Sequence, residues 1–318
     1  GVGETQATSS TLSRGSLGSV RYTSSNSGIA RVDAEGNVTG LRPGKCTIPI
    51  RTHNGRTARV KITIVAAPTS VAFASTEMTM GTDQVARLGC KIQPVAVGSV
   101  RYTSSNPAVI SIDEAAGTAT AVGLGTAVVT AETYNHVVGS CTVTVLRGPD
   151  SVSLSMERTV LGRGEKMAIA AAFQPADAFG GVTYATSNKR ICTVSADGLA
   201  TAKKNGTAVI TATTHNGKTA QITVKVVSAP SSVKFTLPRT KLGVGESTQG
   251  AVTLSRGSVG SYAFSSSNAA VATVDAAGNV TAVAPGKATI TVTTFNRRKR
   301  AVKITVCPAP TSIGLSMG

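Results

Sequence analysis

Tyr22-Thr23-Ser24-Ser25-Asn26 is a short stretch that returns three more times along the chain, at a period of about 80 residues. The later copies read Tyr102-Thr103-Ser104-Ser105-Asn106, Tyr184-Ala185-Thr186-Ser187-Asn188 and Phe264-Ser265-Ser266-Ser267-Asn268. Three other motifs keep the same register. They are an Asp-Ala-X-Gly-Asn stretch best seen from Asp33 and Asp275, a hairpin asparagine (Asn54, Asn135, Asn216, Asn296) and a junction proline (Pro68, Pro149, Pro230, Pro310). A fixed period of this kind predicts an array of structural units.

Within each unit, apolar and polar residues alternate with a period of two, which is the pattern of a half-buried β-strand. Ala288-Thr289-Ile290-Thr291-Val292 shows it, and so does the segment from Val302 to Val306. Asn54-Gly55 and Asn216-Gly217 suit two-residue type I′ hairpins, whose central residues need positive φ. Short strands, frequent turns and no helical period predict antiparallel β-sandwiches of roughly 80 residues each.

Composition narrows the classes of function. The 318 residues include 32 Lys and Arg, 15 Asp and Glu, 3 His and no Trp, which gives a formal net charge of +17. The sequence has no apolar run of about 18 residues that would predict a membrane span, and its first residues lack the features of a signal peptide. The three histidines are too far apart in the sequence to indicate a metal site, and the serines have no His and Asp partners in register that would indicate a catalytic triad. Asp33, Asp113 and Asp275 are not expected to bind calcium, because no unit has a second carboxylate cluster. We therefore expect turn-forming aspartates, no metal, no cofactor and no enzymatic activity.

The repeated motifs also carry a family resemblance. Gly-X-Gly-Glu occurs at 162–165 and 243–246, followed in order by aromatic-X-Ser-Ser-Asn, Val-Asp-X-X-Gly-X-Val-Thr and, at 285–292, Pro-Gly-Lys-Ala-Thr-Ile-Thr-Val. These motifs resemble the bacterial immunoglobulin-like group 2 domain over essentially the whole chain. One departure is that Tyr22, Tyr102, Tyr184 and Phe264 stand where the family usually has a core Trp. The resemblance implies an all-β tandem array of immunoglobulin-like antiparallel β-sandwiches, each with seven strands. It also implies a place in bacterial surface adhesins of the intimin and invasin kind, in cell-wall-attached proteins or in phage tail and capsid proteins.

The repeats divide the chain into four units and a remainder. The predicted ranges are 1–67 for a first unit that lacks its first strand, 68–148, 149–229 and 230–309 for the second to fourth units, and 310–318 for the first strand of a following unit. One explanation is that these residues are a window cut from a longer array. The other is head-to-tail assembly, in which Ser312, Ile313 and Leu315 of one chain complete the first sandwich of another copy by strand addition.

The five cysteines occupy five different columns of the repeat. Cys46, Cys90, Cys141 and Cys192 align with Ala, Val or Ile of other units at inward positions, whereas Cys307 lies near a junction. Buried free thiols, with no repeated disulfide, are the favoured interpretation. Free thiols in an exported protein suit an anaerobic habitat or, for a virion protein, assembly in a reducing cytoplasm.

Basic residues gather at two equivalent hairpins. The last hairpin carries Arg297, Arg298, Lys299, Arg300 and Lys303, and the first carries Arg56 and Arg59. These residues could bind anionic surface polymers by charge alone. The alternative is a solvated edge whose charges block strand-to-strand aggregation. Sequence-specific nucleic-acid binding and membrane insertion are not expected, because no aromatic residues are interleaved with the basic ones and no span is predicted.

The sequence thus favours a non-enzymatic stalk or spacer segment of a large bacterial cell-surface or secreted adhesin-like protein. Its expected partners are neighbouring units or other copies of the chain. Four units in line would reach roughly 150 Å at about 3.3 Å per strand residue. The alternatives are a phage virion segment, as a capsid decoration or tail fibre, and an adhesion module that binds polyanions. The expected location is extracellular or on the bacterial surface, or in a virion under the phage alternative.

Overall fold

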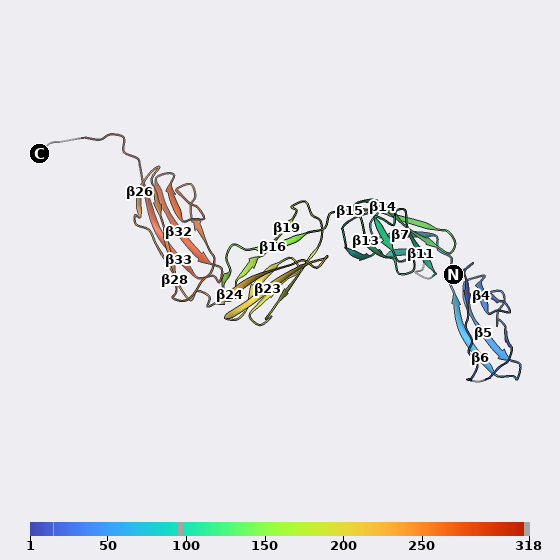
Figure 1. The fold of residues 1–318 in the computed structure, drawn as a ribbon. Coiled ribbons are helices and arrows are strands. Elements are labelled where there is room, and N and C mark those ends of the chain that lie inside the picture. The colour runs from blue at the N-terminus through green and yellow to red at the C-terminus, as the bar shows by residue number, and fades with distance from the viewer. Residues whose placement is uncertain (15, 95–97, 315–318) are drawn as a thin grey trace. The chain divides into compact units, whose positions relative to one another are not determined.

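The computed structural model describes residues 1–14, 16–94 and 98–314, which form strands and turns without a helix in those ranges. The strands make four successive sandwiches (Figure 1). The first sandwich contains β1 (Thr5–Ala7), β2 (Val20–Tyr22), β3 (Ala30–Val32), β4 (Asn37–Gly40), β5 (Gly44–Thr52) and β6 (Thr57–Ile64). The second contains β7 (Ser70–Phe73), β8 (Glu77–Gly81), β9 (Val85–Arg87), β10 (Cys90–Gln93), β11 (Val100–Ser104), β12 (Ile110–Ile112), β13 (Thr118–Ala121), β14 (Gly125–Thr133) and β15 (Val138–Leu146).

The third and fourth sandwiches repeat the order of the second. The third contains β16 (Ser151–Ser155), β17 (Val160–Gly162), β18 (Lys166–Ala168), β19 (Ala170–Gln174), β20 (Val182–Thr186), β21 (Cys192–Val194), β22 (Leu199–Ala202), β23 (Gly206–Thr214) and β24 (Thr219–Val227). The fourth contains β25 (Val233–Thr236), β26 (Lys241–Gly243), β27 (Ser247–Gln249), β28 (Ala251–Leu254), β29 (Tyr262–Ser266), β30 (Ala272–Val274), β31 (Asn279–Ala282), β32 (Gly286–Thr294) and β33 (Lys299–Cys307). The predicted all-β tandem array is confirmed, while the residue limits of its units stay predictions.

The chain divides into two compact units, each with two sandwiches. One unit is Gly1–Pro149 with Asp177–Gly180, and the other is Asp150–Ala176 with Gly181–Gly318. The first and second sandwiches belong to the first unit, and the third and fourth belong, apart from Asp177–Gly180, to the second. Each unit is described by itself below.

The second sandwich shows the strand pairing that the third and fourth repeat. One layer is a sheet of order β11-β14-β15-β8, in which β8 runs parallel to β15. The other layer consists of β12-β13-β9 and the pair β10-β7. β7 and β8 are two halves of one interrupted strand that changes layers, and β9 and β10 are two halves of another. Counted in this way, the described residues give the seven strands that the resemblance implies.

Each sandwich has its own core of aliphatic side chains between the two layers. In the second sandwich Met80, Ile110, Val129 and Val143 are fully buried, and in the others Ile48, Ile210 and Ile290 take the place of Val129. These side chains point inward because they occupy alternate positions along their strands, as the period of two predicts. Small aliphatic side chains therefore fill the interior without a Trp.

Two of the repeated motifs meet at one contact in each sandwich. Gly278 of the Asp275 turn has a φ of 85°, and a Cβ added to it would lie 2.8 Å from Cζ of Phe264. Gly36 and Gly117 take the same position against Tyr22 and Tyr102. Only glycine both adopts this φ without strain and leaves room for the ring. The motif glycine is therefore required by the aromatic residue that replaces the family's Trp.

The aspartates of these turns bind their own backbone. Asp275 Oδ1 accepts hydrogen bonds from the backbone N–H groups of Ala277 at 2.9 Å and Asn279 at 2.8 Å. The hydrogen bonds from Asn279 are the main cause that holds the pKa of Asp275 below its ordinary value. Asp33 and Asp113 accept equivalent backbone bonds. The interpretation of these residues as turn formers is confirmed.

The hairpin turns correct one prediction. Of the Asn54-Gly55 pair only Gly55 has positive φ, at 85°, and its N–H bonds to the carbonyl of Thr52. This is a three-residue loop in which a type I turn is followed by a left-handed residue, so the type I′ prediction is wrong. The turn needs positive φ at one position only, which is why two sandwiches place His136 and Arg297 there without glycine.

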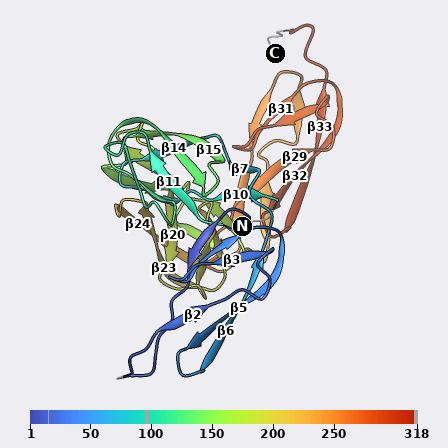
Figure 2. The ribbon, with the colours of Figure 1, turned by 90° about the vertical axis from the view of Figure 1, so that its right-hand side faces the viewer.

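The first sandwich differs from the other three. Among residues 1–14 and 16–67, no strand corresponds to β7, β8 or β10. Its sheet β2-β5-β6 therefore ends at β6, which lies at the margin of the first sandwich in Figure 2. Where the other sandwiches have a fourth strand parallel to the last one, β6 has none in this part of the chain.

The thiols lie largely where the sequence places them. All five cysteines are free; Cys46, Cys141 and Cys192 are buried, Cys90 is half-buried and Cys307 is exposed. Burial raises the pKa of the Cys141 and Cys192 thiols, which lowers their thiolate fraction at neutral pH. The inward positions of the three buried cysteines are confirmed.

Alkylation of the native chain tests this burial. We expect iodoacetamide to label Cys307 first and to label Cys46, Cys141 and Cys192 at least about ten-fold more slowly until the chain is unfolded. Peptide mass spectrometry over a time course measures each rate. Labelling of the three buried thiols at the rate of Cys307 would contradict the core assignment.

Candidate functional site at the sandwich junctions

A glutamate closes a tight loop at one end of the third and fourth sandwiches. The second sandwich has Gln84 at the same position. In the third sandwich the loop follows β17, and Gly164, with a φ of 90°, lets the chain turn back. The backbone N–H of Glu165 bonds to the carbonyl of Gly162, and Glu165 Oε2 accepts the N–H of Gly162 at 2.9 Å. One carboxylate oxygen therefore holds the loop, and the other is free to face outward.

The outward oxygen of Glu165 binds the next sandwich. Oε1 accepts the backbone N–H of Ser261, just before β29 of the fourth sandwich, at 2.6 Å. Arg158 donates a hydrogen bond to the same oxygen and forms an ion pair with it. The Glu165 side chain is 1% exposed. A carboxylate of the third sandwich is thus buried against a backbone donor of the fourth.

The charge on Glu165 is stabilised where it lies. Burial alone would raise the pKa of the carboxyl group, but hydrogen bonds from Arg158, Ser261 and Gly162 outweigh burial and hold the pKa below its ordinary value of 4.5. Burying a charge costs about several kcal/mol of free energy unless the charge is paired and hydrogen-bonded. The fourth sandwich supplies one of the required donors.

Close packing adds to this hydrogen bond. A Cβ added to Gly162 would lie 2.3 Å from the carbonyl oxygen of Val259 and 3.0 Å from the ring of Phe295, both in the fourth sandwich. At the hairpin tip, the side-chain N–H of Asn296 donates to the carbonyl of Pro230 at 2.7 Å. Glycine at 162 is therefore needed for the two sandwiches to approach, and the junction proline is fixed by the hairpin asparagine.

The first and second sandwiches are joined in the same way. Glu4 Oε1 accepts the backbone N–H of Ser99 at 3.1 Å. The hydroxyl of Tyr134 donates to the carbonyl of Val2 at 2.8 Å, and Asn135 donates to the carbonyl of Pro68 at 2.9 Å. Carboxylate, serine N–H, aromatic ring and asparagine recur in the same places, so both junctions are built to one plan.

The loop of the fourth sandwich shows the same local geometry without the second contact. Glu246 Oε2 accepts the N–H of Gly243 at 2.7 Å, and Oε1 accepts a hydrogen bond from Arg239 at 2.9 Å. Its side chain is 45% exposed. Glu246 is therefore a natural control for Glu165, because the two loops differ mainly in whether a following sandwich covers them.

The basic residues singled out from the sequence lie on exposed surface. Arg297 is the positive-φ residue of its turn, and the exposed set comprises Arg297, Arg298, Lys299, Arg300, Lys303, Arg56 and Arg59. The two basic hairpins belong to different compact units. Ser312 and Ile313 are exposed, and Leu315 lies outside the described residues. Whether any of these residues binds a partner stays a prediction.

Residues 1–14, 16–94 and 98–314 contain no group of three His, Cys, Asp or Glu side chains placed to hold a metal ion. In the same ranges, no helix has the length and apolar character to cross a membrane.

Sequence reasoning missed the junction contacts, although a signal was present. Ser99 and Ser261 each stand three residues before the aromatic of the repeated motif, in the units that follow Glu4 and Glu165. Gln84 breaks the glutamate pattern, and the unit after it has Gly181 in place of the serine. Because glutamate and serine recur together, their pairing could have been proposed before the structure.

Replacing Glu165 with Gln tests the shared carboxylate. We expect the hydrogen-exchange protection of the Ser261 N–H to fall by about 1–2 kcal/mol, because a charged acceptor becomes neutral in a buried place. Since the pKa of Glu165 lies below 4.5, its contribution to stability is complete above pH 4.5 and is lost as the pH falls through the folded-state pKa. NMR hydrogen exchange between pH 7 and pH 3 measures both effects. Glu246→Gln is the control and should leave Ser261 unchanged; equal protection in both variants would contradict the assignment.

Comparison with known proteins agrees with this architecture. The bacterial Ig-like domain (group 2) pattern matches residues 2–62, 150–224 and 230–306. An uncharacterized protein of Clostridium acetobutylicum is 31% identical over 132 residues, which is 40% of this chain and 14% of that protein. The second sandwich lies outside the matched ranges, yet its strand order is that of the third and fourth.

Solved structures similar to the chain include a surface layer protein and a human ectodomain. Domains 4–9 of surface layer protein SbsC are 15% identical with a TM-score of 0.25, over 92% of this chain and 58% of that one. The human desmocollin-1 ectodomain is 9% identical with a TM-score of 0.22, over 96% of this chain and 77% of that one. The family pattern matches more than half of this chain, which therefore belongs to the bacterial Ig-like domain (group 2) family.

Proposed function

We propose that the chain is a structural spacer segment of a bacterial cell-surface or secreted protein, which holds a binding module at a distance. Ig-like repeats of this family are typically non-catalytic structural domains. The observation that carries the proposal is the Glu165 carboxylate, which is shared between the third and fourth sandwiches. A spacer needs neighbouring domains that resist bending, and this contact opposes bending between the third and fourth sandwiches.

The contacts between the third and fourth sandwiches are directional. A hydrogen bond to a backbone N–H weakens steeply when the donor and acceptor lose alignment. Rotation of the third sandwich against the fourth would separate the Glu165 carboxylate from the Ser261 N–H. The sandwich itself is stiff, because its interior is close-packed. We therefore expect sandwiches joined in this way to move as one body.

The spacer proposal predicts the effect of one added methyl group. Gly162→Ala should loosen the third sandwich from the fourth, because the new Cβ would meet the Val259 carbonyl oxygen at 2.3 Å. Gly243→Ala is the matched control, because its nearest contact is the side chain of Glu246 at 3.6 Å. Neither glycine has positive φ, so backbone strain does not separate the two variants.

Pulsed electron paramagnetic resonance measures the result. Spin labels at Ala196→Cys and Ala269→Cys, both exposed positions, report the third and fourth sandwiches in a background of Cys90→Ser and Cys307→Ser. We expect a narrow distance distribution in the parent chain and in Gly243→Ala, and a broad one in Gly162→Ala. A broad distribution in the parent chain would refute the stiff-spacer proposal.

A second candidate function, binding of anionic surface polymers, is favoured by one surface. Arg297, Arg298, Lys299, Arg300 and Lys303 are all exposed on β33 and its turn, and no ion pair in the described part of the chain includes them. Like charges held close together on a rigid hairpin create a local positive potential. A polyanion such as heparin or lipoteichoic acid would gain from that potential at low salt.

Charge-matched variants test the polyanion proposal. Replacement of Arg297, Arg298, Lys299 and Arg300 with Ser should lower the salt concentration that elutes the chain from heparin, because fewer counterions are released on binding. The control replaces four exposed lysines of the third sandwich with Ser, namely Lys203, Lys204, Lys218 and Lys225. Both variants lose the same net charge. An equal shift in elution would show that net charge, not the hairpin, is responsible.

A further inference from the structure

The second, third and fourth sandwiches each contain a pair of parallel strands that ties the beginning of the sandwich to its end. β8 pairs with β15, β17 pairs with β24, and β26 pairs with β33. In each case the first of the two strands lies soon after the chain enters the sandwich, and the other is the last strand before the chain leaves it. We call these three the entry–exit pairs.

The parallel direction decides how a pull along the chain acts on an entry–exit pair. In the second sandwich β7 lies beside the beginning of β15, where the carbonyl of Val71 leaves no room for a Cβ at Gly139. β8 lies beside the remainder of β15, from Thr142 to Leu146. The chain therefore enters the sandwich at one end and leaves it at the other. A pull on both ends draws β8 one way and β15 the opposite way.

Strands drawn in opposite directions along their length resist in a particular way. The hydrogen bonds of a parallel pair are evenly spaced along the strands and lie across the pull, so they share the force and must break together. A hairpin that is opened from one end instead loses its bonds one at a time. Because each bond adds to the free energy of the intact pair, the resistance of an entry–exit pair grows with its length.

The entry–exit pair of the second sandwich is the longest of the three. β8 and β15 pair over five residues, whereas the other two pairs extend over three residues each. The long pair begins where the N–H of Thr142 donates to the carbonyl of Thr76 at 2.8 Å. The counterparts of Thr142 are Thr223 and Lys303. In the described part of the chain, neither of them forms such a backbone bond.

One residue explains why the long pair begins earlier. Between β7 and β8, the hydroxyl of Ser75 donates to the carbonyl of Glu77 at 2.7 Å and accepts the N–H of Glu77 at 3.3 Å. This short turn lets β8 begin at Glu77. The counterparts of Ser75 are Met156 and Leu237, which pack against the cores of their sandwiches. An apolar side chain at this position draws the connection inward, so the parallel pairing begins later along the chain.

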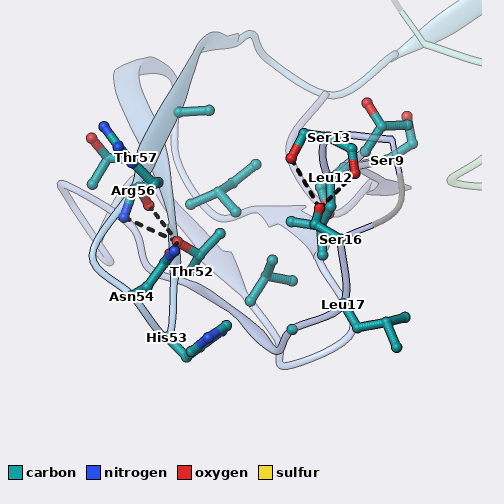
Figure 3. A pocket seen from close by; sticks show the side chains of 16 residues that line it. Ser9, Leu12, Ser13, Ser16, Leu17, Thr52, His53, Asn54, Arg56 and Thr57 are labelled. Carbon is teal, nitrogen blue, oxygen red and sulfur yellow. Dashed lines mark hydrogen bonds between the residues drawn. The ribbon is translucent and has the colours of Figure 1, made fainter.

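The hairpin that holds the last strand does not differ among these sandwiches. β14–β15, β23–β24 and β32–β33 each pair over eight residues. At the tip, the hydroxyl of Thr133 accepts the N–H of Val137 at 3.1 Å, and equivalent bonds close the other tips. Figure 3 shows the same bond in the first sandwich, between Thr52 and Arg56. The second, third and fourth sandwiches therefore differ in the entry–exit pair and not in the hairpin.

We propose that the chain carries tension along its length, and that the second sandwich unfolds later under a pull than the third and the fourth. This proposal rests on the spacer role, because a spacer transmits any force between its anchor and the module that it presents. It goes beyond stiffness, since the junction contacts oppose bending whereas the entry–exit pair sets how long a sandwich stays folded under force. The third and fourth sandwiches open first and lengthen the chain while the second stays folded.

Two exposed positions allow a pull through these three sandwiches in the full chain. Cys307 is exposed at the end of β33, and Ala66, between the first two sandwiches, is exposed as well. With Ala66→Cys in a background of Cys90→Ser, two thiols accept DNA handles, while the three buried cysteines stay unlabelled in the native chain. A constant force in optical tweezers then passes through the second, third and fourth sandwiches.

The order and lifetimes of the unfolding steps test the proposal. Forced unfolding follows the unfolding rate, so we expect three steps, the last at least about ten-fold slower than the other two. Thr142→Pro removes the N–H that bonds to Thr76 and should shorten the lifetime of the last step at least about ten-fold. Thr223→Pro, at the same position of the third sandwich, is the matched control and should leave the last step unchanged.

A milder variant covers the case in which Thr142→Pro prevents folding. Ser75→Ala removes the turn that begins β8, and its side chain is exposed, so the second sandwich should still fold and its step should shorten. Equal lifetimes of the three steps in the parent chain would overturn the proposal. A last step that responds to Thr223→Pro but to neither Thr142→Pro nor Ser75→Ala would overturn it as well. Because these measurements do not report bending, such a failure leaves the stiff-spacer proposal standing.

Discussion

A buried carboxylate needs donors, and Glu165 obtains one of them from another domain. Its own loop and Arg158 donate hydrogen bonds to the carboxylate, and the Ser261 N–H of the next sandwich is a further donor. Removing that donor would leave a carboxylate oxygen poorly paired in a buried place, which costs more free energy than a typical surface contact contributes. The orientation of the third sandwich relative to the fourth is therefore tied to the electrostatics of one side chain.

The fold could be predicted from the sequence because its causes are local and repeated. Alternation along β32 and β33 places Ile290 and Ile304 in the core, whatever the neighbouring unit does. The glycine of the Asp275 turn is dictated by a ring in the same sandwich, so both recur together in every unit. Four copies of each pattern make accidental agreement improbable.

The candidate site could not be predicted to the same depth, because its contacts join residues far apart in the sequence. Glu165 and Ser261 are 96 residues apart, and a backbone N–H donor leaves no mark of its own in the residue type. The hairpin turn type was missed for a related reason. Asn-Gly is compatible with two turn geometries, and only the backbone shows that a single positive φ, at Gly55, is used.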